Sequence, residues 1–184
     1  MANSQRTDAR LPFLIINVVG GVAVLGSYAH GIATHPETAG QLWGSLPEAA
    51  VPFYTGCMPF AAIGYLTVFA FLLVQKPSQV RFGRGPAYPW FMGSHAVFLL
   101  ASTLWMPLCF AALDGASPGL LPWIQLVLAI AGSAALVHVV WLIRLVDSPW
   151  PRLRAAAIVG ATGLMIQCTI LDALVWPRFF TVGG

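Results

Sequence analysis

Five long apolar runs, close to residues 12–34, 51–75, 89–112, 119–146 and 154–178, take up most of this chain of 184 residues. Each run is long enough to cross a bilayer core about 30 Å thick, which takes about 20 helical residues. In hydrocarbon only an α-helix or a closed barrel satisfies every backbone N–H and C=O group. Because the runs are continuous rather than alternating, the sequence predicts an all-α fold. We expect one integral membrane domain over residues 1–184, built as a bundle of five transmembrane helices.

The composition agrees with a lipid environment. Hydrophobic residues make up 58% of the chain and charged residues only 8%, whereas a soluble domain carries about 25% charged residues. The net charge of +3 is spread over three connections and forms no single basic patch, so we expect no nucleic-acid partner. The lipid bilayer is therefore the first predicted partner.

The basic residues predict which side of the membrane each end of the bundle faces. Positive charge marks the cytoplasmic side. Eight of the nine basic residues lie on one side of the predicted bundle: Arg6, Arg10, Lys76, Arg81, Arg84, Arg144, Arg152 and Arg154. Only Arg178 lies on the other side. We therefore expect a cytoplasmic N-terminus and an external C-terminus, in the inner (cytoplasmic) membrane of a bacterium.

Five tryptophans lie near the ends of the runs, where membrane proteins place an interfacial aromatic belt. They are Trp43, Trp90, Trp123, Trp150 and Trp176.

The outer half of the predicted membrane region holds most of the polar residues within the runs: His30, Tyr54, Gln167 and Asp172. A carboxylate inside a span costs about 3 kcal/mol or more, and such a group usually faces a bundle interior with a partner. His30 is at a similar depth to Asp172 and is one predicted partner. The alternative is that Asp172 reaches interfacial water or Arg178.

Two prolines interrupt helices at matched depth in the same half. Pro59 and Pro107 each remove a helical hydrogen bond and tend to kink a helix. Two such kinks would splay the second and third helices and leave a pocket between them, near Trp105. The alternative is ordinary membrane-helix proline, which lipid-embedded helices tolerate.

A pair of histidines lies in the inner half. His95 and His138 are on adjacent helices, at depths that differ by about 3 Å on the helical rise. Two such imidazoles would hold a haem iron from both faces. A structural role in the bundle is the alternative.

Small residues recur at four-residue spacing, as in Ala131 and Ala135 and in Ala156 and Gly160. Such stripes let helix backbones approach closely. They serve either folding of one chain or association into a homodimer or larger complex.

Residues 102–110 read STLWMPLCF. This segment resembles the third-helix signature, Asn-x-x-Trp-x-Pro-x-Phe-Phe, of the tryptophan-rich sensory protein/translocator protein (TspO/MBR) family. The resemblance implies a five-helix bundle, often dimeric, with a pocket for porphyrins, sterols or similar flat apolar ligands, lined by Trp105. The chain departs from the family at Ser102, at Cys109 and in its first loop, which lacks the family's lysine.

Three functions follow from these observations. The first is binding of a small apolar ligand, porphyrin-, sterol- or terpenoid-like, in an outer-half pocket with Pro59, Trp105 and Pro107 as walls. His30, Asp172, Gln167 and Tyr54 would supply its polar contacts.

The second is an enzyme that transfers protons on a lipid or terpenoid, with Asp172 and either His30 or Glu48 as catalytic groups. The third is an accessory subunit of a membrane complex that carries haem at His95 and His138. No Gly-x-Ser-x-Gly, HExxH or phosphate-loop pattern is present to favour a known catalytic class.

Overall fold

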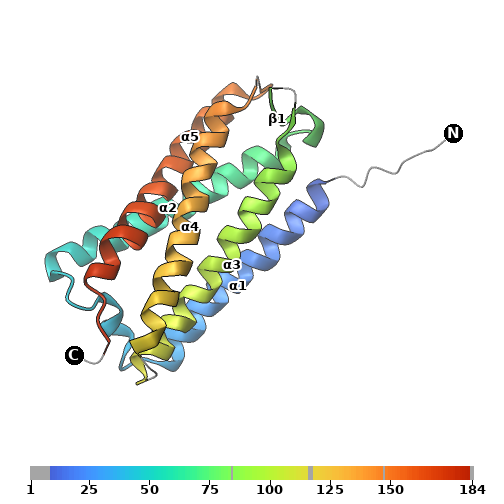
Figure 1. The fold of residues 1–184 in the computed structure, drawn as a ribbon. Helices are drawn as coiled ribbons and strands as arrows, with labels where there is room; N and C mark the ends of the chain where they lie inside the picture. Colours follow the sequence, from blue (N-terminus) through green and yellow to red (C-terminus); the bar gives the residue numbers. More distant parts are fainter. Residues whose placement is uncertain (1–8, 84, 116–117, 147, 183–184) are drawn as a thin grey trace.

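Five long helices make up the fold (Figure 1). The computed structural model describes residues 9–83, 85–115, 118–146 and 148–182. The helices are α1 (Arg10–Thr34), α2 (Val51–Val74), α3 (Tyr88–Leu113), α4 (Leu121–Arg144) and α5 (Pro151–Met165), which continues into the π-helix η5 (Ile166–Val175). All five are long and apolar enough to cross a membrane. The prediction of an all-α integral membrane protein with five spans is therefore confirmed.

Short elements connect the spans. The 3-10 helices η1 (Ala39–Trp43) and η2 (Glu48–Ala50) lie between α1 and α2, η4 (Pro118–Leu120) precedes α4, and η6 (Trp176–Arg178) follows η5. Between α2 and α3, η3 (Pro77–Gln79) leads into a small antiparallel hairpin of β1 (Arg81–Phe82) and β2 (Gly85–Pro86). We call the end of the bundle that holds this hairpin the hairpin end, and the opposite end the carboxyl-terminal end.

Proline marks the start of four of the long helices. A proline lies in the first turn of α2, α3, α4 and α5: Pro52, Pro89, Pro122 and Pro151. Backbone N–H groups in the first turn of a helix have no acceptor within the helix, so proline loses no hydrogen bond there, and its fixed φ is already helical. These residues therefore set where each span begins.

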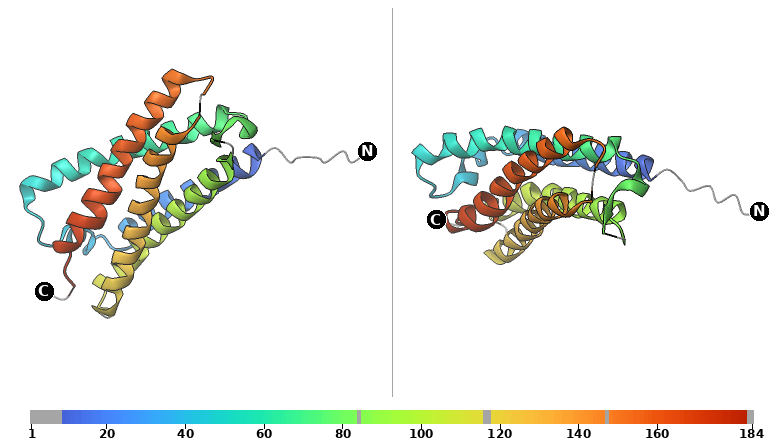
Figure 2. Two further views of the ribbon diagram at one scale, coloured as in Figure 1. Left: turned by 45° about the horizontal axis from the view of Figure 1, so that its top comes forward. Right: turned by 90° about the horizontal axis from the view of Figure 1, so that it is seen from above.

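The helices pack in the spatial order α1, α3, α4, α5, α2. Helices α1 and α2 meet only towards the hairpin end, where the rings of Phe13 and Phe69 lie 5.6 Å apart. Towards the carboxyl-terminal end the two helices diverge, because α2 crosses the bundle obliquely and follows α5 (Figures 1 and 2).

The contact between α2 and α5 depends on two glycines. A Cβ atom on Gly160 would lie 2.9 Å from both the Cα and the carbonyl oxygen of Gly64, and a Cβ on Gly64 would overlap the backbone of Gly160. Lipid tails are as apolar as leucine, so helices in a membrane gain mainly from van der Waals packing at such close approaches. The predicted close approach at Gly160 is thus found within one chain.

Arg154 closes the hairpin end. Its guanidinium donates hydrogen bonds to the carbonyl oxygens of Leu142, Ile143 and Leu145, at 3.1, 2.9 and 2.8 Å. The last carbonyl groups of a helix have no partner within the helix. One side chain from α5 therefore satisfies the end of α4 and orients the two helices.

The first loop and the C-terminal segment bind each other at the carboxyl-terminal end. Trp176 Nε1 donates to Leu42 O at 2.9 Å, and the backbone N–H of Ser45 donates to Phe179 O at 2.9 Å. Trp176 is buried, whereas Trp90, Trp123 and Trp150 are more than half exposed. Trp176 therefore packs inside the protein at the end of its span, where its indole binds a loop carbonyl.

Replacing Gly64 with leucine is expected to lower the free energy of unfolding by about 1–3 kcal/mol or more. The new side chain would collide with the backbone of Gly160, which cannot move aside as a flexible side chain can. Reversible unfolding in mixed micelles, followed by circular dichroism, measures the change. Gly56→Leu is the matched control, because a Cβ at this position of α2 meets nothing within 4 Å. Equal stability of the two variants would contradict the close approach.

Candidate functional site

Two groups of buried and half-buried polar side chains lie in the bundle, one in each half. The aspartate centre consists of Tyr28 on α1, Trp105 on α3 and Gln167 and Asp172 on η5, in the half towards the carboxyl-terminal end. The histidine centre consists of Asn17 on α1, Tyr65 on α2, His95 on α3 and His138 on α4, in the half towards the hairpin end.

The winding of η5 sets the geometry of the aspartate centre. Gln167 Nε2 donates to Asp172 Oδ1 at 2.7 Å. These residues are five apart, which matches the i→i+5 pattern of a π-helix. The segment is held against α4 by Thr169, whose hydroxyl donates to Gly132 O at 2.7 Å. The sequence predicted His30, interfacial water or Arg178 as the partner of Asp172, whereas the π-helix gives it the amide of Gln167 as its hydrogen-bond partner.

Aromatic rings from three spans contact one another at Trp105 of the aspartate centre. The Trp105 ring lies 5.5 Å from the Tyr28 ring and 5.7 Å from the Trp176 ring, both edge to face. Tyr28 is also close enough to Asp172 for an electrostatic interaction between them. These contacts bring residues of the first, third and fifth spans to one place.

Two polar atoms of the aspartate centre are buried without a hydrogen-bond partner in the described part of the chain. They are the donor Trp105 Nε1 and the acceptor Gln167 Oε1. Most buried polar groups in proteins are hydrogen-bonded, and an unpaired one costs about 1–3 kcal/mol. A hydroxyl group both donates and accepts, so a ligand hydroxyl has the chemistry to pair with a donor such as Trp105 Nε1 or an acceptor such as Gln167 Oε1.

Tyr54 also lies near this centre, as the sequence predicted. It is buried, and its hydroxyl donates to Leu171 O at 3.2 Å. This bond ties the start of α2 to η5, one residue before Asp172.

Four other predicted site residues point elsewhere. His30 on α1 and Glu48 in η2 are exposed, and no interaction joins either side chain to Asp172 among the described residues. Pro59 and Pro107 are exposed as well. The proline rings therefore do not line a site in the bundle interior. They lie on the outer surface of the bundle, and membrane helices tolerate proline at such positions.

The histidine centre is a compact cluster. The rings of His95 and His138 are 4.4 Å apart between centroids, and both side chains are fully buried. His95 Nδ1 bonds the carbonyl oxygen of Phe91 at 2.9 Å. A carbonyl only accepts, so Nδ1 carries the proton and Nε2 of the neutral ring has the lone pair. His95 Nε2 and both nitrogens of His138 have no partner in the described residues.

This arrangement does not fit a haem between the two rings. Bonds of about 2 Å from an iron to each imidazole would separate the ring centroids by about 6 Å. The observed 4.4 Å leaves no room for an iron and its porphyrin. No group of three or more potential metal-ligating side chains occurs within the described ranges either.

Tyr28 was not among the predicted site residues, although its position relative to two glycines of α1 indicates the face on which it lies. Gly20 and Gly31 mark the face of α1 that contacts α3, because a Cβ on either would overlap Leu99 or Phe110. Tyr28 is eight residues after Gly20 and three before Gly31, so it shares that face. His30 does not have this spacing and is exposed.

The hydrogen bond between Tyr65 and Asn17 was also missed. The Tyr65 hydroxyl donates to Asn17 Oδ1, and Asn17 Nδ2 donates to Phe13 O at 2.7 Å. No spacing rule within one helix links residues on different spans, so only the fold shows this pair.

Comparison of the chain with protein-family models, with curated proteins and with solved structures found no match.

Replacing His138 with leucine is expected to raise the free energy of unfolding by about 1 kcal/mol or more, because two buried nitrogens without partners are removed. His95→Leu is the matched comparison and is expected to gain less, since it also loses the bond to Phe91. Both are measured by reversible unfolding in micelles. A clear loss of stability in His138→Leu would contradict this expectation and show that the imidazole has a hydrogen-bond partner in the folded protein.

Proposed function

We propose that this integral membrane protein binds a small apolar molecule with one hydroxyl or carbonyl group at the aspartate centre. Sterol-like and terpenoid-like alcohols belong to this class, and porphyrins are the further class that the third-helix resemblance implies. The observation that carries the proposal is that two buried atoms of this centre, Trp105 Nε1 and Gln167 Oε1, have no hydrogen-bond partner among the described residues, while Gln167 donates to Asp172. Ligand sites are mostly apolar with a few polar groups that fix orientation.

The π-helix η5 supports the same proposal. Such helices are rare and frequently lie at functional sites. Here the π-helical winding pairs Gln167 with Asp172 and leaves Gln167 Oε1 for a further partner. A ligand hydroxyl would donate to this oxygen and accept from Trp105.

The arrangement of α1 and α2 supports a route from the lipid. The two helices diverge towards the carboxyl-terminal end (Figure 2), and Tyr28 lies on α1 in that half, in ring contact with Trp105. An apolar ligand dissolved in the bilayer would enter between these helices and meet Tyr28 first.

Binding is favoured over catalysis by what surrounds Asp172. The two groups expected to share proton transfer with it, His30 and Glu48, are exposed, whereas an amide donates to its carboxyl group. In a binder, Asp172→Asn is expected to change ligand affinity only modestly. An enzyme would lose turnover with this change and keep its affinity.

Trp105→Phe is expected to weaken binding of farnesol or cholesterol by about three- to tenfold, since the aromatic ring stays and one hydrogen bond is lost. Trp105→Ala should weaken it further. Equilibrium binding to protein in lipid nanodiscs measures the affinity, with protoporphyrin IX as a third probe.

Trp176→Phe is the control for that experiment. It removes an indole N–H that already binds Leu42 O, so it is expected to lower stability and leave ligand affinity unchanged. If neither alcohol nor the porphyrin binds the wild-type protein, the proposal fails.

We also propose that the hairpin end faces the cytoplasm, as the basic residues indicate. Ser78 in η3 and Ser45 after η1 lie at opposite ends of the bundle. In a variant whose three cysteines are replaced by alanine, Ser45→Cys is expected to react with an impermeant maleimide on intact cells. Ser78→Cys should react only after the membrane is opened. Labelling of Ser78→Cys from outside would reverse the assignment.

A further inference from the structure

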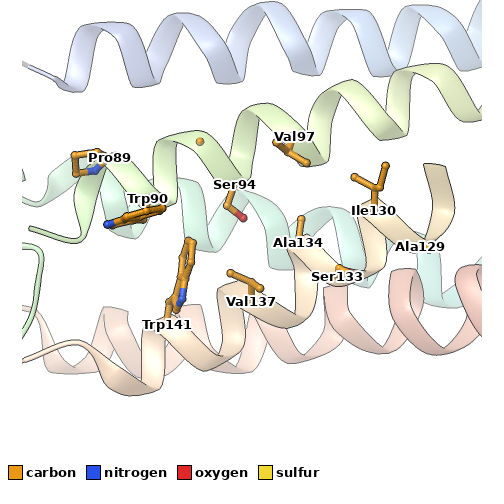
Figure 3. A pocket seen from close by; sticks show the side chains of 11 residues that line it. Pro89, Trp90, Ser94, Val97, Ala129, Ile130, Ser133, Ala134, Val137 and Trp141 are labelled. Carbon is orange, nitrogen blue, oxygen red and sulfur yellow. The ribbon is translucent and has the colours of Figure 1, made fainter. Parts of the chain in front are cut away.

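A groove of about 790 Å³ runs along the seam between α3 and α4 (Figure 3), and none of its lining residues belongs to either polar centre. Small residues form its floor, among them Gly93, Ser133 and Ala134, and Val97 and Ile130 flank it. Trp90 and Trp141 stand together at one end, with ring centroids 6.5 Å apart. The groove shares no residue with the aspartate centre, so it is a separate site.

The length of the groove matches one leaflet of a bilayer. On α4 it extends from Ala129 to Trp141 and on α3 from Pro89 to Val97, which is about 18 Å and about 12 Å at the helical rise of 1.5 Å per residue. Half of a hydrocarbon core is about 15 Å. The tryptophan pair marks the interfacial end, because Trp90 begins the span at the hairpin end and is 64% exposed.

A basic side chain continues the same face beyond the tryptophans. Val137, Trp141 and Arg144 are spaced at four and three residues, which places them on one face of α4. Arg144 is exposed in the last turn of α4 and makes no hydrogen bond or ion pair in the part of the chain that the structure describes. An arginine at this level is a strong partner for a phosphate group.

The charge around the mouth of the groove favours an anion. The hairpin end carries six described basic residues: Arg10, Lys76, Arg81, Arg144, Arg152 and Arg154. The acidic residues that the structure describes are at or towards the other end: Glu37, Glu48, Asp114 and Asp172. Basic residues near a membrane surface attract anionic lipids.

We propose that this groove binds an anionic glycerophospholipid from the leaflet at the hairpin end. One acyl chain lies along the small residues of the floor, the two indoles lie at the level of the interface, and the phosphate pairs with Arg144. The site is independent of ligand binding at the aspartate centre.

The test uses delipidated full-length protein in detergent, titrated with phosphatidylglycerol or with phosphatidylcholine of the same acyl chains, with bound lipid counted by native mass spectrometry. Phosphatidylglycerol is expected to bind more tightly. Arg144→Gln is expected to weaken phosphatidylglycerol binding about fivefold and to leave phosphatidylcholine binding unchanged. Arg152→Gln, at the same end of the bundle but on α5, is the charge control and should have little effect.

A second variant tests the groove itself. A Cβ at Gly93 meets nothing within 4 Å, so Gly93→Phe fills the groove without a clash and is expected to abolish binding of both lipids. Gly26→Phe on α1, where a Cβ also meets nothing within 4 Å, is the control and should bind normally. Equal affinity for the two lipids, or unchanged binding in Gly93→Phe, would overturn the proposal. So would a lipid-independent dimer that Gly93→Phe dissociates, because the groove would then hold a second copy of the chain.

Discussion

Contact between helices inside a bilayer gains little from the exclusion of water, so this bundle depends on places where backbones come close enough for dense van der Waals packing. The meeting of Gly64 and Gly160 is the closest of these. It fixes α5 against α2, and the bond from Thr169 to Gly132 fixes η5 against α4. These two attachments position Gln167 and Asp172. The aspartate centre therefore depends on packing at residues outside it, chiefly the glycines Gly64, Gly132 and Gly160.

The spans were predictable because length and apolar composition decide membrane insertion, and their bounds differ from the expected ones by only a few residues. The site was less predictable. The sequence singled out Tyr54, Trp105, Gln167 and Asp172 as candidate site residues, but the pairing of Gln167 with Asp172 requires π-helical winding, which spacing rules for an α-helix cannot give. Helical rotation also matters more than depth: His30 is level with the site, yet Tyr28 two residues earlier is the one that faces it.

The polar groups of the bundle differ in how completely they are satisfied. Asn17 and Tyr65 form a closed hydrogen-bonded pair with a backbone carbonyl, which is the usual state of buried polar groups. The imidazole of His138 and the indole of Trp105 lack such partners among the described residues. Polar atoms without hydrogen-bond partners among the described residues thus occur in each half of the membrane region, at the aspartate centre and at the histidine centre. The apolar groove lies on a separate surface.

The bonds from Trp176 to Leu42 and from Ser45 to Phe179 join the earliest loop to the latest segment of the chain. During synthesis, the nascent chain presents the loop to the translocon long before its binding partners leave the ribosome. Helix α2 likewise lacks its main neighbour until the fifth span has been translated. Helix α1 gains its main neighbour with the third span, so the packing around α2 and the first loop is the part of the structure that is completed only after translation of the final span.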